Sequence, residues 1–144
     1  MSACTFFGHR ECYGLEERAL RAAIEELIRD GVDTFYVGNH GMFDTMVRKV
    51  LRQLEKKYTH ITCSVVLAYL PAGKKVEDMS NTIYPAGLEL EPLRFAIEYR
   101  NKWMIGAADY CLCYVCHSWG GAYKFAELAE RRGLRVINLG NMDI

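Results

Sequence analysis

Glycine, histidine and arginine residues follow three apolar runs of the sequence, and these residue types suit the binding of a phosphorylated ligand. Gly8-His9-Arg10 ends the first run, Gly38-Asn39-His40-Gly41 ends the second, and Ser118-Trp119-Gly120-Gly121 follows the fourth. Glycine lets a ligand approach the backbone, and free N–H groups at the start of a helix favour an anion. Arginine can bind a phosphate through two parallel hydrogen bonds. These segments hold the candidate ligand-binding residues, and Trp119 could stack on a base.

The elements that must position these residues alternate between apolar runs and amphipathic helical patterns. We expect strands at 4–8, 34–38, 60–70, 109–115 and 134–140, and helices at 15–31, 41–58, 90–108 and 120–133. Continuous apolar strands between helices are typical of a parallel sheet that is covered on both faces. The sequence therefore predicts one α/β domain over 1–144, a Rossmann-like three-layer sandwich with a mostly parallel sheet. In such sheets ligands bind outside the carboxyl ends of the strands, where the three segments should meet.

A polar stretch at 71–87, punctuated by proline and glycine, is the longest segment without a helix or strand pattern. Loops of this length are usually functional or mobile. It is either a lid over the site or a surface insertion.

Charge and hydropathy exclude several classes of partner. The chain has 144 residues with 18 Lys+Arg and 18 Asp+Glu, so its formal net charge is zero. No overall basic field attracts nucleic acid, which is therefore not expected as a partner. No run reaches the roughly 18 apolar residues that span a bilayer, and the first ten residues do not resemble a secretory signal. We expect a cytoplasmic protein with no membrane partner.

Six cysteines in such a chain are expected to be reduced thiols. The segment CLCYVCH matches a haem-attachment string, and its Cys111, Cys113, Cys116 and His117 could also be metal ligands. Haem attachment requires export, and free cysteine packs like a small apolar residue in a strand. We therefore expect packing, with no metal and no cofactor.

Three segments together resemble a known family. TFFGHR, FYVGNHGMFD and ADYCLCYV…GGAYKFAELAERRGLRVINL resemble the small YpsA-like branch of the SLOG superfamily, over nearly the whole chain. That superfamily takes in SMF/DprA proteins and LOG enzymes. The resemblance implies a Rossmann-like fold and a homo-oligomer. It also implies binding of a nucleotide or of an NAD- or ADP-ribose-derived small molecule, as a sensor or as a sequestering protein of the kind used against antiphage defence.

The resemblance to LOG enzymes implies an alternative activity, cleavage of the N-glycosidic bond of nucleoside 5′-monophosphates. Arg100 matches the catalytic arginine of that group, Gly120-Gly121 matches its glycine pair, and Glu127 falls on its motif glutamate. Trp119 replaces the motif proline, and Tyr123-Lys124 replaces a Gly-Thr pair of the phosphate cradle. Lys124 could supply a charge to the phosphate instead. Arg100 and Glu127 are thus either a catalytic pair or a surface pair, and both interpretations stay open.

Overall fold

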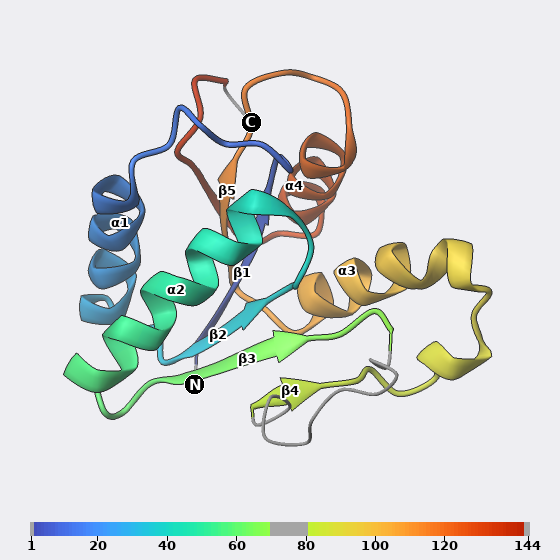
Figure 1. Ribbon diagram of the computed structural model, residues 1–144, viewed down its shortest axis with the longest axis horizontal. Coiled ribbons are helices and arrows are strands. Elements are labelled where there is room, and N and C mark those ends of the chain that lie inside the picture. Colours follow the sequence, from blue (N-terminus) through green and yellow to red (C-terminus); the bar gives the residue numbers. More distant parts are fainter. Residues whose placement is uncertain (1, 70–80, 143–144) are drawn as a thin grey trace.

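Six strands form one parallel sheet in residues 2–69 and 81–142, the part of the chain that the computed structural model describes (Figure 1). In the order in which they lie side by side, they are β4 (Thr82–Ile83), β3 (Thr62–Val66), β2 (Thr34–Val37), β1 (Ala3–Gly8), β5 (Tyr110–Tyr114) and β6 (Arg135–Asn138). All neighbouring pairs are parallel. Cys4 of β1 pairs with Phe35 on one side and Tyr110 on the other, so β1 is an inner strand.

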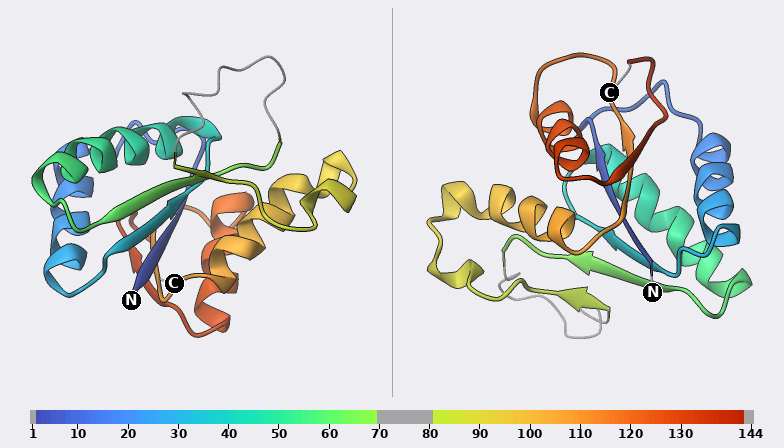
Figure 2. Two further views of the ribbon diagram at one scale, coloured as in Figure 1. Left: turned by 90° about the horizontal axis from the view of Figure 1, so that it is seen from below. Right: turned by 180° about the vertical axis from the view of Figure 1, so that it is seen from behind.

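The helices α1 (Glu17–Arg29) and α2 (Gly41–Lys57) cover one face of the sheet (Figure 2). Their apolar residues recur at helical spacing, and the faces that they form are buried: Leu20, Ile24, Leu27 and Ile28 in α1, and Phe43, Val47, Val50, Leu51 and Leu54 in α2. Full burial of such a side chain contributes about 1.5–3 kcal/mol. Packing against the sheet therefore stabilises both helices.

The opposite face is covered by α3 (Ala96–Gly106) and α4 (Gly121–Arg131), and the short 3₁₀ turns η2 (Leu88–Leu90) and η3 (Leu93–Phe95) precede α3. Successive side chains of a strand point to opposite faces. Phe6 of β1 accordingly packs in the cluster with α1 and α2, and Phe7 packs with Met104 and Phe125 in the cluster with α3 and α4. This arrangement confirms the predicted three-layer Rossmann-like fold.

The winding of the chain reverses between β1 and β5. After β1 the chain enters α1 on one face, and after β5 it enters α4 on the other. At such a switch point the two loops diverge and leave a crevice outside the carboxyl ends of the strands. The fold thus places the loops at 9–16 and 115–120 around one crevice.

Two elements differ from the sequence-based expectation. β4 lies inside the predicted loop 71–87 and pairs with β3, and its two residues are too short to show a periodic pattern. α3 begins at Ala96 rather than near residue 90. Pro92 is extended, with φ −56° and ψ 143°, so the helical pattern starts only after it, first as η3.

Residues 71–80 of the predicted loop and the last residue of the predicted strand 60–70 lie outside the described residues, so the suggestion of a lid at 71–87 stays a prediction. Within the described part of the chain no helix is long and apolar enough to cross a bilayer. A cytoplasmic location, a single domain over the whole chain and a homo-oligomer stay predictions.

Candidate functional site

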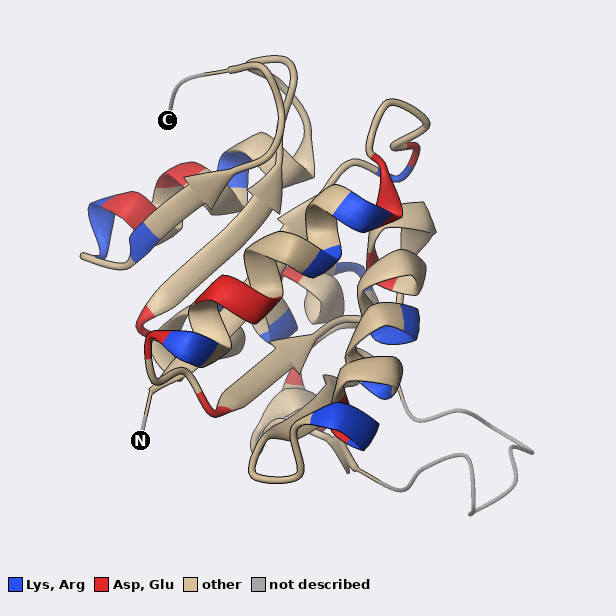
Figure 3. Ribbon diagram, turned by 90° about the vertical axis from the view of Figure 1, so that its left-hand side faces the viewer, with Lys and Arg blue, Asp and Glu red and all other residues tan. Residues whose placement is uncertain are grey.

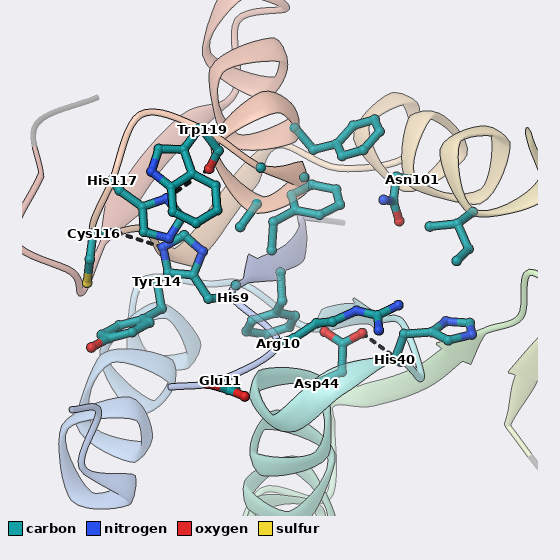
Figure 4. A pocket seen from close by; sticks show the side chains of 18 of the residues that line it. His9, Arg10, Glu11, His40, Asp44, Asn101, Tyr114, Cys116, His117 and Trp119 are labelled. Carbon is teal, nitrogen blue, oxygen red and sulfur yellow. Dashed lines mark hydrogen bonds between the residues drawn. The ribbon is translucent and has the colours of Figure 1, made fainter. Parts of the chain in front are cut away.

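A cavity of about 610 Å³ opens at the switch point, beside the carboxyl ends of β1 and β5 (Figure 4). We refer to it as the crevice. Eight of the residues predicted for the site line it: Gly8, His9, Arg10, His40, Arg100, Trp119, Gly120 and Gly121. The other six, all in described segments, do not line it: Gly38, Asn39, Gly41, Ser118, Lys124 and Glu127. The parallel sheet therefore brings together side chains from three strand ends, and their contact with a ligand stays a prediction.

Three aromatic rings are stacked at one end of the crevice, and we call His9, His117 and Trp119 the ring stack (Figure 4). The ring centroids of His9 and His117 are 4.0 Å apart with an interplanar angle of 17°. Those of His117 and Trp119 are 3.7 Å apart with an angle of 14°. Trp119 is 69% exposed, so its ring is available to a further flat group. Any of the nucleobases can stack on such a ring, because every base has a flat π-face.

Hydrogen bonds to the loop fix both histidines of the ring stack. The backbone N–H of Cys116 donates to Nε2 of His9 at 2.9 Å, and Nδ1 of His117 lies 2.9 Å from the carbonyl oxygen of Trp119. A backbone N–H only donates and a carbonyl only accepts, so His9 carries its hydrogen on Nδ1 and His117 also donates from Nδ1. Burial, followed by the neighbouring His117, lowers the pKa of His9, which favours the neutral acceptor form.

The start of α4 faces the crevice through Gly120, Gly121 and Ala122. Gly120 precedes the helix with φ 90° and ψ 173°, a conformation that only glycine adopts readily. No side chain caps this end of α4. The first N–H groups of the helix and the positive end of its dipole are therefore directed to a region that an anion can occupy.

Arg10 is exposed in the loop after β1 and adds positive charge beside the crevice. Its carbonyl oxygen accepts a hydrogen bond from the backbone N–H of Met42 at 2.8 Å. This backbone bond ties the loop to the start of α2 and does not involve the guanidinium of Arg10.

Gly8 has a packing role that the sequence did not reveal. A Cβ atom at this position would lie 2.1 Å from Cγ of Phe43 in α2. Glycine is therefore required here so that the buried Phe43 ring can pack on the end of β1, whether or not a ligand approaches the backbone.

A second group of polar side chains lines the crevice, and we call His40, Asp44, Arg100 and Asn101 the polar cluster. Arg100 comes from α3 and is only 2% exposed. Its guanidinium donates to the carbonyl oxygen of Val66 at 3.0 Å and to Oδ1 of Asn101 at 2.7 Å, and it lies 3.3 Å from Nδ1 of His40. Asp44 comes from the first turns of α2 and accepts the backbone N–H of His40 at 3.1 Å.

The titration of the polar cluster is shifted by its surroundings. Burial raises the pKa of Asp44 to about 6, although the N–H of His40 and the charges of Arg100 and Arg48 act in the opposite direction. Burial is the main cause that lowers the pKa of His40, and the positive charge of Arg100 lowers it further. At neutral pH the cluster therefore holds a neutral histidine, a cationic arginine and an anionic carboxylate. Shifted carboxyl and imidazole groups in a cleft are typical of functional sites.

The two residues of the predicted catalytic pair lie in different surroundings. Glu127 accepts a hydrogen bond from the Tyr123 hydroxyl at 2.6 Å and lies 3.6 Å from the Arg131 guanidinium, all on α4. Arg100 lines the crevice and Glu127 does not. Lys124, suggested as a phosphate ligand, pairs with Glu98 of α3. No hydrogen bond or ion pair joins Arg100 to Glu127 in the described part of the chain, and the catalytic role stays a prediction.

The cysteines of the CLCYVCH segment are free thiols that pack in and after β5. Cys111 and Cys113 are buried, and Cys116 is half-buried. A hydrogen bond with Cys113, together with burial, raises the pKa of Cys111, so the metal-binding thiolate is disfavoured. Within residues 2–69 and 81–142 no three His, Cys, Asp or Glu side chains are grouped to hold a metal ion.

Sequence reasoning missed Asp44 and Asn101. Both lie inside helical patterns, where polar residues are usually solvated. One signal was present for Asp44, since it lies on the first turns of a helix that follows the second strand end. Asn101 adjoins Arg100 on α3 and gave no separate signal.

Comparison with known proteins supports the fold. No protein-family model and no curated protein matches the sequence. Among solved structures, the chain is similar to DNA processing protein A from Helicobacter pylori, with a TM-score of 0.65 and 13% identity. The similarity covers 95% of this chain but only 64% of that one. It supports the Rossmann-like fold alone, and the relation to the SLOG superfamily, with its DprA, YpsA-like and LOG branches, stays a prediction.

The same comparison corrects one expectation. The zero net charge predicted that nucleic acid is not a partner, yet the similar structure describes a single-stranded DNA binding mode of DNA processing protein A. The fold is thus compatible with nucleic acid. The prediction was wrong in its physical basis. The phosphate backbone of a nucleic acid is bound by positive side chains on one surface of a protein, whereas the net charge sums over all surfaces.

Proposed function

We propose that the crevice binds a nucleotide, with the base on Trp119 and a phosphate at the start of α4 beside Arg10. The observation that supports this most directly is the ring stack, whose exposed indole adjoins the free N–H groups of α4. A flat aromatic surface and an anion site within one cavity match the two ends of a nucleoside phosphate. The cavity of about 610 Å³ also lies within the range of roughly 300–1,000 Å³ typical of small-molecule sites.

Binding without cleavage is the form of the proposal that we favour, so the protein would sense or sequester its ligand. Cleavage of an N-glycosidic bond needs a group that transfers a proton or stabilises positive charge at the sugar. Glu127, proposed for that task, is held by Tyr123 and Arg131 on the surface of α4. NAD- and ADP-ribose-derived molecules are included in the ligand class because they contain the same nucleotide unit.

Calorimetric titration of the purified protein tests the proposal. The ligands are the four ribonucleoside 5′-monophosphates, ADP-ribose and NAD, and each mixture is analysed by chromatography afterwards. We expect saturable binding with the ligand recovered intact. Release of free base and ribose phosphate would establish the hydrolase instead, and the absence of binding for every ligand would refute the proposal.

Two variants locate the binding. Trp119→Ala should weaken binding by about 1–3 kcal/mol through loss of stacking. Arg10→Ala should weaken it by about 1.5–3 kcal/mol through loss of a charged hydrogen bond. Leu90→Ala is the matched control, because Leu90 is 82% exposed and apolar but does not line the crevice. Equal affinities for Arg10→Ala and the control would remove Arg10 from the site.

A second candidate function is the binding of a single-stranded nucleic acid that continues from the crevice. The similar structure of DNA processing protein A suggests it, and one surface observation favours it. Arg48, Arg52 and Lys56 recur every four residues and so share a side of α2, and the Lys and Arg positions of this helix are blue in Figure 3. α2 begins at Gly41, and His40 before it and Asp44 in its first turns line the crevice. Short labelled oligonucleotides, measured by fluorescence anisotropy, distinguish this function from mononucleotide binding.

A further inference from the structure

The polar cluster offers both hydrogen-bond donors and an acceptor to the crevice. Arg100 is a permanent donor. Because its guanidinium can only donate, Nδ1 of His40, 3.3 Å away, is an acceptor and the hydrogen of His40 is on Nε2. Oδ1 of Asn101 accepts from Nε of Arg100, so Asn101 can present its amide N–H groups. Donors therefore come from α3 and from the loop after β2.

The acceptor is the carboxylate of Asp44, which comes from α2, the helix on the opposite face of the sheet from α3. A Cβ atom on Gly38 would lie 2.8 Å from Oδ2 of Asp44 and 2.9 Å from a guanidinium nitrogen of Arg100. The two groups thus meet over the end of β2, one from α2 and one from α3. No ion pair joins Asp44 to Arg100 in the described part of the chain, so both groups can still form a hydrogen bond to a ligand.

This mixture of groups selects among ligand chemistries. A phosphate is purely an acceptor, and an adjoining carboxylate repels it. A hydroxyl both donates and accepts, and adjacent hydroxyls are satisfied by a carboxylate together with N–H donors. The polar cluster therefore suits a sugar diol better than a second phosphate.

We propose that Asp44 and Arg100 bind the ribose hydroxyls of the nucleotide, so that the crevice selects ribonucleotides over 2′-deoxyribonucleotides. This inference rests on the proposed function and identifies its ligand class. The backbone N–H of His40 binds only Oδ2 of Asp44, so a ligand without the hydroxyl leaves Oδ1 of this carboxylate without a ligand partner, and such sites reject analogues that lack the group. The hydroxyl donates to Asp44, and the guanidinium of Arg100 donates to the hydroxyl oxygen.

The test compares calorimetric affinities of the four ribonucleoside 5′-monophosphates with those of their 2′-deoxy counterparts at neutral pH. The wild-type protein should bind the best ribonucleotide roughly tenfold to a hundredfold more tightly than its deoxy analogue, as expected for a hydrogen bond to a charged group. Asp44→Ala should bring this ratio close to one. Glu11→Gln is the matched control, because Glu11 also lines the crevice but is exposed, and it should keep the wild-type ratio.

The possible outcomes separate the two proposals. If both sugars bind with equal affinity to the wild-type protein, nucleotide binding stands and ribose selection is overturned. If Asp44→Ala keeps the wild-type ratio, Asp44 is not the selecting group and the inference fails. The wild-type ratio needs no variant, so it decides even where Asp44→Ala does not fold. Binding of no nucleotide at all would instead overturn the proposed function itself.

Discussion

The surroundings of Asp44 disfavour the ionised carboxylate, which is the state that its proposed role in ribose binding requires. Its carboxyl is buried in the wall of the crevice, and burial raises its pKa from 3.8 to about 6. Such a group binds a proton more readily in the folded chain than in the unfolded one. Its contribution to stability is therefore fully present below about pH 3.8 and is lost as the pH rises through about 6. Natural proteins retain unfavourable buried charges mainly where function needs them.

Replacement of Asp44 by asparagine should therefore stabilise the protein at neutral pH. Asparagine keeps the shape and can still accept the N–H of His40, but it carries no buried charge. We expect the free energy of unfolding at about pH 7.5 to rise by about 1–3 kcal/mol. The difference should shrink below about pH 5, where the wild-type carboxyl is protonated. Denaturant unfolding at the two pH values measures this, and a less stable variant at neutral pH would contradict the burial argument.

His9 should be important for the loop before α4 through its hydrogen bond rather than through its ring alone. His9→Phe keeps an aromatic ring in the stack but leaves the Cys116 N–H without its acceptor. We expect a loss of about 1 kcal/mol in the free energy of unfolding at neutral pH. His60→Phe, at an exposed histidine away from the crevice, is the control.

The pH dependence of His9 gives a second readout. Its pKa is lowered from 6.5 in the folded protein, so its contribution to stability is present above 6.5 and is lost as the pH falls through the folded value. The difference between His9→Phe and the wild type should therefore narrow in acid. A difference that is constant between neutral and acidic pH would show that protonation of His9 does not break the bond to Cys116.

Among the elements, α4 depends on one glycine for its approach to the crevice. Gly120→Ala places a side chain in a conformation that is essentially restricted to glycine, at a cost of about 1–3 kcal/mol. It should also weaken nucleotide binding, because the first N–H groups of α4 are displaced. Gly106→Ala is the matched control, since a Cβ there meets nothing within 4 Å and Gly106 ends a helix. Thermal unfolding of both variants checks the contrast, and equal melting temperatures would contradict it.

Sequence patterns predicted the elements well where apolar spacing controls them. The alternation of apolar runs with amphipathic helices was sufficient for the parallel sheet and for the strand ends that carry His9, Arg10 and Trp119. β4 was missed because two residues show no period, and the start of α3 was shifted by Pro92. Asp44 was missed because its neighbour Arg100 comes from α3, which packs against the sheet from the opposite face. Contacts between layers are set by tertiary packing, which a linear pattern does not contain.

At the scale of the whole molecule, the site follows from topology and its charge is local. The crevice lies where the winding reverses between β1 and β5, so any sequence with this strand order would have a cleft there. What this chain adds is a ring stack at one end and a polar cluster further along. The formal net charge of zero does not reveal local charge such as the basic side of α2, so composition could not exclude nucleic acid as a partner.

Charge reversal on α2 separates binding in the crevice from binding along the surface. Arg52 is exposed and does not line the crevice, so Arg52→Glu should leave mononucleotide affinity unchanged. If a single strand follows α2, the same variant should weaken oligonucleotide binding. It should also reduce the slope of log K against log salt concentration by about one. Arg29→Glu at the end of α1 is the control. Weaker mononucleotide binding by Arg52→Glu alone would place the ligand outside the crevice.

The central claim is that a nucleotide base lies on Trp119, and the fluorescence of that indole reports it most directly. In a Trp103→Phe background Trp119 is the remaining tryptophan of the chain. Titration with the four ribonucleoside 5′-monophosphates should then change its emission in a saturable way, with the same midpoint as the calorimetric titration. Heat of binding with no change in the emission of Trp119, or no binding at all, would contradict the account.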